Sequence, residues 1–187
     1  MQEAKAGKAD VYFVDAAHFV LGAFLAILWS FKRLFIKTSS GRSRLNILGA
    51  LNAVTHEMIT VINDAYINAW SVVDLMRKIR EKNSTGRIVL ILDNARYQAC
   101  YVVRSAANMM HIELLYLPPY SPNLNLIERV WKFVRKKCLN CVYHESFEIF
   151  SKAITGCISN FGTEYKEELE TLLQWNFQTF ASEEKVA

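Results

Sequence analysis

Residues 118–140 read PPYSPNLNLIERVWKFVRKKCLN and predict the passage from a strand into a basic helix. Two prolines end the strand, and Ser121 can cap a helix whose first residue is Pro122. Apolar residues then recur at helical spacing and define one buried face, made of Ile127, Val130, Val134 and Cys138. We therefore expect one long helix from Pro122 to about Leu139, with the bases on its open face.

Strand patterns come first in the chain, and strand-helix alternation follows. Strands are predicted at residues 10–19, 23–36, 45–55 and 57–63, and then at 87–93 and 112–118. Helices are predicted from Asn68 until residues 83–86 stop the helix, and over residues 98–110, 145–161 and 164–180. Antiparallel hairpins followed by alternation predict an α/β protein with a mixed sheet and helices on both faces.

Length and composition indicate one globular domain. The chain has 187 residues, of which 52% are hydrophobic, enough for one sizeable core. We divide it into a tail (residues 1–9), a catalytic domain (10–162) and an acidic helical extension (163–187). No apolar run reaches the roughly 18–20 uncharged residues of a membrane helix, and the four cysteines lack a disulfide-like spacing. We expect a cytoplasmic protein without a membrane partner.

Charge is distributed unevenly along the chain. Six of the 18 acids and only two of the 22 bases lie in residues 160–187, so the first 159 residues carry a net charge of +8. Bases cluster in residues 32–44 and again in residues 129–137. This pattern is compatible with a solvated basic face and also with a surface that binds a polyanion, which would associate the protein with the nucleoid.

Three acids stand where an α/β protein gathers its ligands. Asp93 ends the most buried strand, Asp15 lies near the end of the first strand, and Glu128 lies about two turns into the Pro122 helix. Each has a simpler reading, as a loop cap, a strand-end turn and a helix salt bridge, respectively. Together, three convergent carboxylates would suit Mg²⁺ or Mn²⁺ in a two-metal site that acts on phosphodiesters.

Three segments resemble a known family. They read YFVDAAHF (residues 12–19), LILDNARYQ (90–98) and LPPYSPNLNLIERVWKFVRKK (117–137). They are similar to the signature blocks of DDE-type transposases of the mariner-like superfamily, in particular its bacterial insertion-sequence branch. The 34 residues between Asp93 and Glu128 are also typical of that superfamily. The resemblance implies a ribonuclease H-like fold.

The resemblance also implies roles for individual residues. Asp15, Asp93 and Glu128 would be the catalytic, metal-binding triad, with Asn94 supporting it. His18 lies near Asp15 in the sequence, which suits either a supporting residue of the site or a structural histidine. The chain departs from the family at Gln98, where many relatives carry a histidine. The residues expected to bind DNA are Lys132, Arg135, Lys136, Arg129, Arg42 and Arg44.

The expected activity is cutting and joining of DNA strands. Water would attack the phosphodiester at the transposon end, and the freed 3′-hydroxyl would then attack target DNA. Only nine residues precede Asp10, so we expect a separate helix-turn-helix chain or a full-length transposase to recognise the ends, with the protein forming a homo-oligomer on DNA. One alternative is an inactive or domesticated remnant that binds nucleic acid or a partner. Another is a ribonuclease H-like nuclease that acts on a different nucleic acid.

Overall fold

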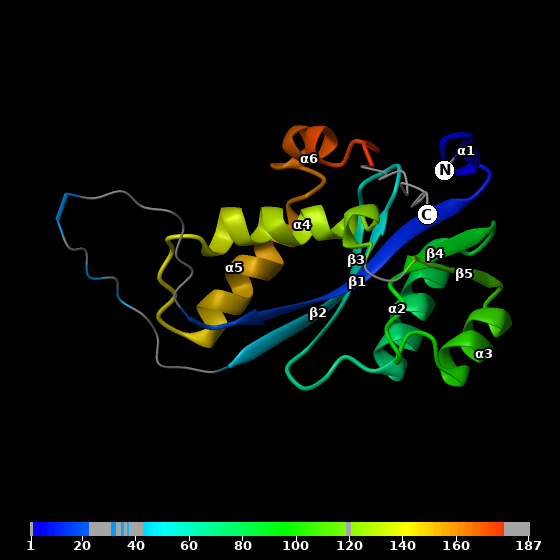
Figure 1. The fold of residues 1–187 in the computed structure, drawn as a ribbon, viewed down its shortest axis with the longest axis horizontal. Coiled ribbons are helices and arrows are strands. Elements are labelled where there is room, and N and C mark those ends of the chain that lie inside the picture. The colour runs from blue at the N-terminus through cyan, green and yellow to red at the C-terminus, as the bar shows by residue number, and fades with distance from the viewer. Residues whose placement is uncertain are drawn as a thin grey trace, which may run out of the picture.

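The computed structural model describes residues 2–22, 31, 32, 35, 37, 43–118 and 121–177, and within them five strands form a single sheet (Figure 1). The strands are β1 (Asp10–Val20), β2 (Arg44–Asn52), β3 (Met58–Asn63), β4 (Ile88–Leu92) and β5 (Ile112–Tyr116). The helices are α1 (Gln2–Lys5), α2 (Ala69–Lys82), α3 (Tyr101–Met109), α4 (Ile127–Val134), α5 (Phe147–Ser159) and α6 (Lys166–Leu172). A 3₁₀ turn, η1 (Pro122–Leu124), precedes α4, and a π-helical turn, η2 (Arg135–Leu139), follows it.

The sheet has the order β3-β2-β1-β4-β5. Strand β1 pairs antiparallel with β2, which pairs antiparallel with β3, whereas β1, β4 and β5 run parallel. The predicted mixed sheet is therefore confirmed. The further strand predicted at residues 23–36 falls mostly outside the described residues.

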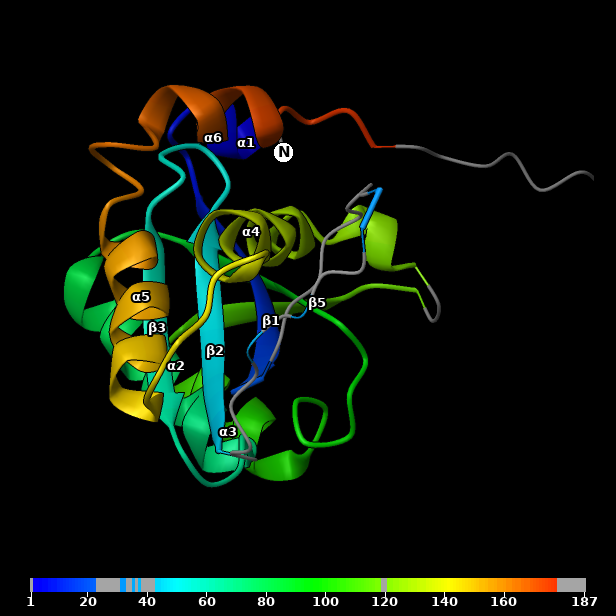
Figure 2. The same cartoon turned by 90° about the vertical axis from the view of Figure 1, so that its left-hand side faces the viewer.

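The two faces of β1 belong to different halves of the core. Val11 and Phe13 pack with α4 and α5 on one side, whereas Tyr12 and Val14 pack with α2 and α3 on the other. The side chains alternate because successive residues of a strand point to opposite faces. Figures 1 and 2 show the two helical layers and place α1 and α6 beyond α4 at one end of the molecule.

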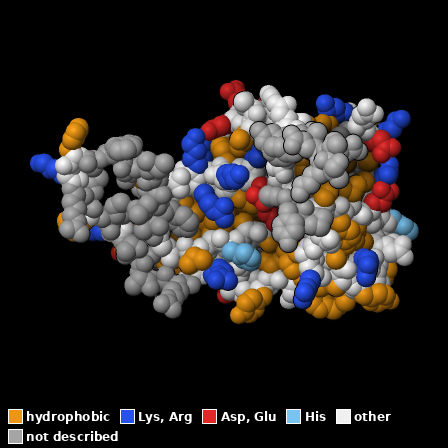
Figure 3. Space-filling model, in the orientation of Figure 1, with side chains coloured by type: hydrophobic (Ala, Val, Ile, Leu, Met, Phe, Trp, Pro, Cys, Tyr) orange, Lys and Arg blue, Asp and Glu red, His pale blue; other side chains and the backbone are white. Residues whose placement is uncertain are grey.

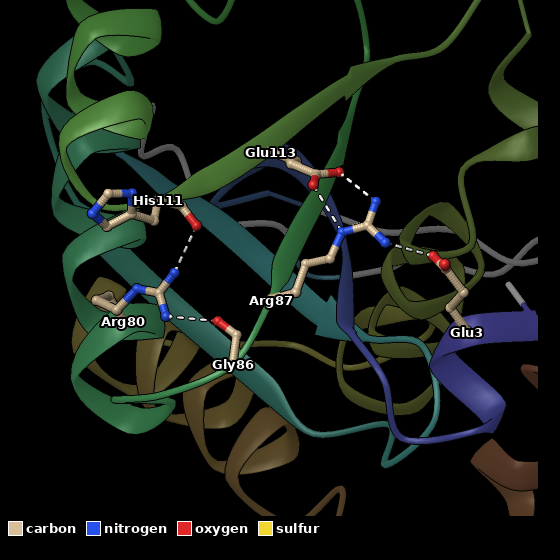
Figure 4. A network of polar contacts seen from close by, with 6 residues as sticks. All are labelled: Glu3, Arg80, Gly86, Arg87, His111 and Glu113. Atoms are coloured by element: carbon tan, nitrogen blue, oxygen red, sulfur yellow. Dashed lines mark hydrogen bonds and ion pairs between the residues drawn. The ribbon is translucent and has the colours of Figure 1, made fainter.

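Charged side chains tie the helices to the start of β4 and β5 (Figure 4). The Arg80 guanidinium, near the end of α2, donates hydrogen bonds to the carbonyl oxygens of Asn83, Gly86, Met110 and His111, at 2.8–3.1 Å. Arg87 pairs with Glu113 on β5 and with Glu3 on α1. Arg80 therefore satisfies carbonyl groups at the ends of α2 and α3 that would otherwise lack a partner within the protein, and Arg87 joins α1 and β5 to the start of β4.

The helix predicted to run unbroken from Pro122 to Leu139 is interrupted. After η1 the chain begins α4 only at Ile127, and its cap residue, Leu126, makes no side-chain capping bond. The Asn125 side chain lies between these pieces and donates to the Val14 carbonyl at 3.2 Å. This contact ties the chain to β1 just before the helix starts, and it puts Glu128 in the first turn of α4, not two turns in.

The predicted C-terminal helix is shorter than expected. It ends at Leu172, whereas the pattern predicted a helix to residue 180. Leu173 is fully buried, and Trp175 and Phe177 pack against the same core, which favours an irregular path over a regular helix face. None of the described helices combines the length and apolar character that a membrane crossing requires.

Candidate active site

Asp15 and Asp93 lie beside each other on neighbouring strands. The pairing of β1 with β4 runs from Asp10 opposite Ile88 to Val14 opposite Leu92, so Asp93 follows directly beside Asp15. The prediction that Asp15 lies near the end of its own strand is wrong, because β1 continues to Val20. The neighbouring strand β4 ends at Leu92, opposite Val14, so Asp15 has no strand residue paired with it on that side.

A small pocket joins these acids to α4. It has a volume of about 160 Å³ and is lined by Asp15, Asp93, Leu117, Pro118, Ser121, Asn125 and Glu128. The two strands supply Asp15 and Asp93, and the first turn of α4 supplies Glu128. Two strands and a helix far apart in sequence therefore bring the three predicted carboxylates to one cavity.

Burial and like charges act on the pocket acids. Burial is the main cause that raises the pKa of Asp15 to about 7, and the charges of Asp93 and Glu128 act in the same direction. Partial burial also raises the pKa of Asp93 above its ordinary value. None of the salt bridges recorded in the described part of the chain includes any of the three acids. The pocket therefore favours a bound cation or protons.

Trp131 on α4 orients Asp15. Its indole Nε1 donates to Asp15 Oδ2 at 3.1 Å, and its ring lies over Gly49, which is opposite Asp15 in the register of β1 and β2. A Cβ at Gly49 would meet the Met58 side-chain end first and the tryptophan ring at 2.9 Å from Cη2. The absence of a side chain at Gly49 thus allows the tryptophan to approach the sheet and hold the carboxylate.

Asn125 is a site residue that reasoning from the sequence missed. It is 4% exposed, and its Oδ1 is buried without a hydrogen-bond partner while its Nδ2 is engaged by Val14. An unpaired buried oxygen is costly unless something in the pocket satisfies it. The signal in the sequence was a polar residue immediately before the apolar run Leu126 and Ile127.

Gln98 is a buried amide that acts on Asp93. Its side chain is fully buried, and its Nε2 donates to Tyr97 Oη at 3.3 Å. Hydrogen bonding from the Gln98 side chain also lowers the pKa of Asp93, in opposition to burial. Burial and the nearby Asp93 charge raise the pKa of Tyr97 to about 12, so this phenol keeps its proton.

The two predicted supporting residues lie apart from the pocket lining. Asn94 is exposed beside Asp93 and does not line the cavity. His18 is three residues beyond Asp15, so it faces the opposite side of β1, where its Nδ1 lies 2.6 Å from Asn46 Oδ1. The structure therefore does not bring His18 to the carboxylates.

The predicted DNA-binding bases have different surroundings. Lys132 and Lys136 are exposed on α4 and η2, and Arg135 lies 5.5 Å from the Phe19 ring centre. Figure 3 shows basic side chains over α4 next to exposed acidic ones. Arg44 is exposed at the start of β2, and Arg42 lies outside the described residues. Arg129 is already occupied by three backbone carbonyls.

The pocket fits a divalent cation in its chemistry. Three carboxylates and an amide oxygen are the hard ligands that Mg²⁺ and Mn²⁺ prefer. Among the described residues, however, no group of three or more histidine, cysteine, aspartate and glutamate side chains is arranged to hold a metal ion.

Comparisons with known proteins agree with this geometry. Residues 10–151 match the family described as DDE superfamily endonuclease. An uncharacterized protein, y4pE/y4sA, from Sinorhizobium fredii (strain NBRC 101917 / NGR234) is 33% identical over 78 residues, which cover 42% of this chain and 53% of that protein. The chain thus spans about half the length of this curated relative.

Solved structures show the same fold. The Mos1 transposase paired-end complex with left transposon end has a TM-score of 0.67 at 13% identity, covering 94% of this chain and 59% of that one. The Mos1 mariner paired end complex with Mn has a TM-score of 0.61 at 13% identity, covering 94% and 57%. The ribonuclease H-like fold implied by the resemblance is confirmed.

Proposed function

The chain belongs to the DDE superfamily endonucleases, and on this premise we propose that it is the catalytic domain of a transposase that cuts and joins DNA strands. The observation that carries the proposal is the 160 Å³ pocket, in which Asp15, Asp93 and Glu128 converge and, within the part of the chain that the structure describes, form no salt bridge. Asp15 and Glu128 are half-buried and Asp93 is exposed, and like charges held this close are costly unless a cation joins them. The assignment to a bacterial insertion sequence stays a prediction.

Asp15, Asp93 and Glu128 would hold divalent ions, Mg²⁺ or Mn²⁺, and the unpaired Asn125 Oδ1 is an oxygen that could help to hold them. A Mos1 paired end complex solved with Mn supports the choice of metal class. When bound, such ions supply charge stabilisation for the attacking and leaving oxygens of an in-line displacement at phosphorus. The triad and the ligand set are proposals drawn from the carboxylates in the pocket.

The residues around the pocket would hold the reacting groups in place. Trp131 fixes one oxygen of Asp15, and Gln98 fixes Asp93. Lys132 and Lys136, exposed beside the pocket on α4 and η2, would contact backbone phosphates of the bound DNA. Water would attack the phosphodiester, forming a 5′-phosphate, and the 3′-oxygen would leave as a hydroxyl after taking a proton. In the second step that hydroxyl would lose its proton and attack a target phosphodiester, and the target's 3′-oxygen would leave as a hydroxyl.

Nicking of supercoiled plasmid in the presence of Mn²⁺ tests the proposal. We expect relaxed product from the chain, alone or with a separate helix-turn-helix chain added, and loss of that product in Asp93→Asn. The matched control is Asp74→Asn, which removes an exposed acid from α2 that pairs with Arg77. Absence of nicking under all these conditions would exclude the enzyme, whereas full activity in Asp93→Asn would exclude the triad.

A second candidate is a remnant that binds nucleic acid or a partner without cutting. The observation that favours it is that no metal-holding group is already arranged within the described residues. Salt-dependent DNA binding without Mn²⁺-dependent cleavage would support this function. Cleavage of an RNA strand but not of DNA would instead identify a nuclease with another substrate.

A further inference from the structure

Arg129 directly follows Glu128 in α4, and its side chain binds the C-terminal segment. Its Nη1 donates to the carbonyl oxygens of Leu172 at 3.1 Å and Gln174 at 2.8 Å, and its Nη2 donates to that of Asn176 at 2.8 Å. The guanidinium carbon also lies 6.0 Å from the Phe177 ring centre. A base predicted to meet phosphates is thus engaged by three backbone carbonyls of its own chain.

The segment that Arg129 binds is anchored to the rest of the core, and we call residues 172–177 the strap. Trp175 Nε1 donates to the Ala53 carbonyl at 3.0 Å, and Lys5 Nζ lies 4.5 Å from the Trp175 ring centre. The Phe177 ring lies 6.2 Å from that of Phe13, which is on the same face of β1 as Asp15. The strap therefore connects α1, β1 and the turn after β2 to the start of α4.

The first turn of α4 has no side-chain cap. Its cap residue, Leu126, makes no side-chain capping bond, and the backbone amides of Glu128 and Arg129 instead donate to the carbonyl oxygens of Asn125 and Leu126 at 3.2 and 3.1 Å. Glu128 and Arg129 both belong to that turn. Hydrogen bonds from a charged donor are among the stronger ones in proteins, so three of them can fix the rotation of the turn.

From these contacts we infer that Arg129 is a positioning residue: by binding the strap, it holds the first turn of α4 and so places Glu128 against Asp15 and Asp93. This inference rests on the proposed function of the pocket. It also reassigns Arg129 from a phosphate contact to an internal one. A displacement of a catalytic group by about 1 Å can lower a rate on the order of 100-fold, so a small shift of Glu128 after loss of the strap contacts would lower the rate of DNA cleavage.

The first test separates positioning from DNA binding. In plasmid nicking with Mn²⁺, Arg129→Gln should lower kcat about 10- to 100-fold while KM and the salt dependence of DNA binding stay as in the wild type. Arg129→Lys should restore part of kcat because one donor group remains. Lys132→Gln provides the contrast, since loss of a phosphate contact should weaken binding and lower the salt slope by about 0.9.

The second test uses the far end of the strap. Trp175→Phe keeps the ring but removes the bond to Ala53, so it should lower kcat by a smaller factor than Arg129→Gln. The double variant should be no slower than Arg129→Gln alone, because both changes release the same segment. Arg77→Gln, on the exposed face of α2, is the matched control and should leave kcat unchanged.

Hydrogen exchange gives a readout that needs no activity. Arg129→Gln and Trp175→Phe should both speed exchange at the backbone amides of residues 127–129, and Arg77→Gln should not. If the wild type does not nick DNA, the proposed function fails, and this exchange result still decides whether the strap holds α4. Unchanged exchange at these amides, or a weaker and less salt-dependent DNA affinity with normal kcat in Arg129→Gln, would overturn the inference.

Discussion

The two ends of β4 differ in how their charges are satisfied. At its start, Arg87 pairs with Glu3 and Glu113, and Arg80 serves four carbonyls (Figure 4). At its end, three carboxylates share one pocket, and none of the ion pairs in the described residues includes them. The charges at the start of β4 have partners within the protein. The carboxylates at its end have no such partner among the described residues, which favours a bound cation or protons.

This difference separates a structural arrangement from a functional one. Charges that serve the fold are paired, and pairing lowers the pKa of Glu113 below its ordinary value. Charges kept together without partners destabilise the fold, and burial raises the pKa of Asp15 instead. Such opposed shifts are typical of a binding or catalytic site.

The largest expected effect is found by comparing the removal of one acid at the end of β4 with the removal of one acid near its start. Glu128→Gln should lower the nicking rate by roughly 1000-fold, because it takes a charge from the pocket in which the phosphodiester would react. Glu113→Gln should change the rate less than about twofold, since it only releases a surface pair. Plasmid relaxation with Mn²⁺ measures both, and equal losses would contradict the distinction between the two ends.

The next effect is on stability and pH in metal-free protein. The folded pKa of Asp15, about 7, lies above the ordinary value of 3.8, so the folded state binds more protons between these values. This contribution to stability is complete below pH 4 and is lost as the pH rises through 7, by roughly 4 kcal/mol in all. Glu113 has the opposite effect on the pH dependence. Its folded pKa is lowered, so its contribution to stability is present at neutral pH and is lost as the pH falls through that pKa.

Chemical denaturation at pH 5 and pH 8, with a chelator present, measures this dependence. Asp15→Asn should flatten it and should make the protein more stable than the wild type at pH 8. The raised pKa of Asp15 would be contradicted if the free energy of unfolding of the wild type, relative to that of Asp15→Asn, rose between pH 5 and pH 8.

A smaller effect is expected from a methyl group at Gly49. Gly49→Ala should press on Trp131 and disturb its bond to Asp15, with a loss of about 1–3 kcal/mol in stability and about tenfold in nicking rate. Gly156→Ala is the matched control in α5, where an added Cβ meets no atom within 4 Å. That change should stabilise by about 0.5–1 kcal/mol, and thermal unfolding compares the two.

The smallest expected effect concerns the bases beside the pocket. Lys132→Ala should weaken DNA binding a few-fold and reduce the salt slope by about 0.9, as for one lost phosphate contact. Lys152→Ala removes an exposed base on α5 that already pairs with Glu148, so it should leave the slope unchanged. The two outcomes are separated by measuring DNA affinity at about 50 to 200 mM salt and comparing the salt slopes of the two variants.

Much of the fold followed from local patterns. The apolar run that ends at Asp93, the capped start of α2 at Asn68 and the strand at Ile112–Tyr116 were all predicted within a few residues. These elements carry their own signals, since periodicity, caps and β-branched residues act over short distances. The sequence also named the three acids that the structure brings to one pocket.

What the sequence could not predict depends on neighbours. The end of β4 beside Val14, and not the end of β1, exposes Asp15. The interruption of the long helix follows from a bond between Asn125 and β1, and the use of Arg129 follows from a strap 43–47 residues away. A local pattern contains no information on which distant carbonyl a side chain will reach.

The sequence by itself therefore determined the kinds of element, their order, the mixed sheet and the identity of the acids, because these depend on short-range periodicity and on recognisable motifs. Only the tertiary structure decided that Trp131 holds Asp15, that Asn125 lines the pocket and that His18 faces away from it. The physical reason is that pairing register and packing set where side chains meet, and both arise between segments far apart in the chain.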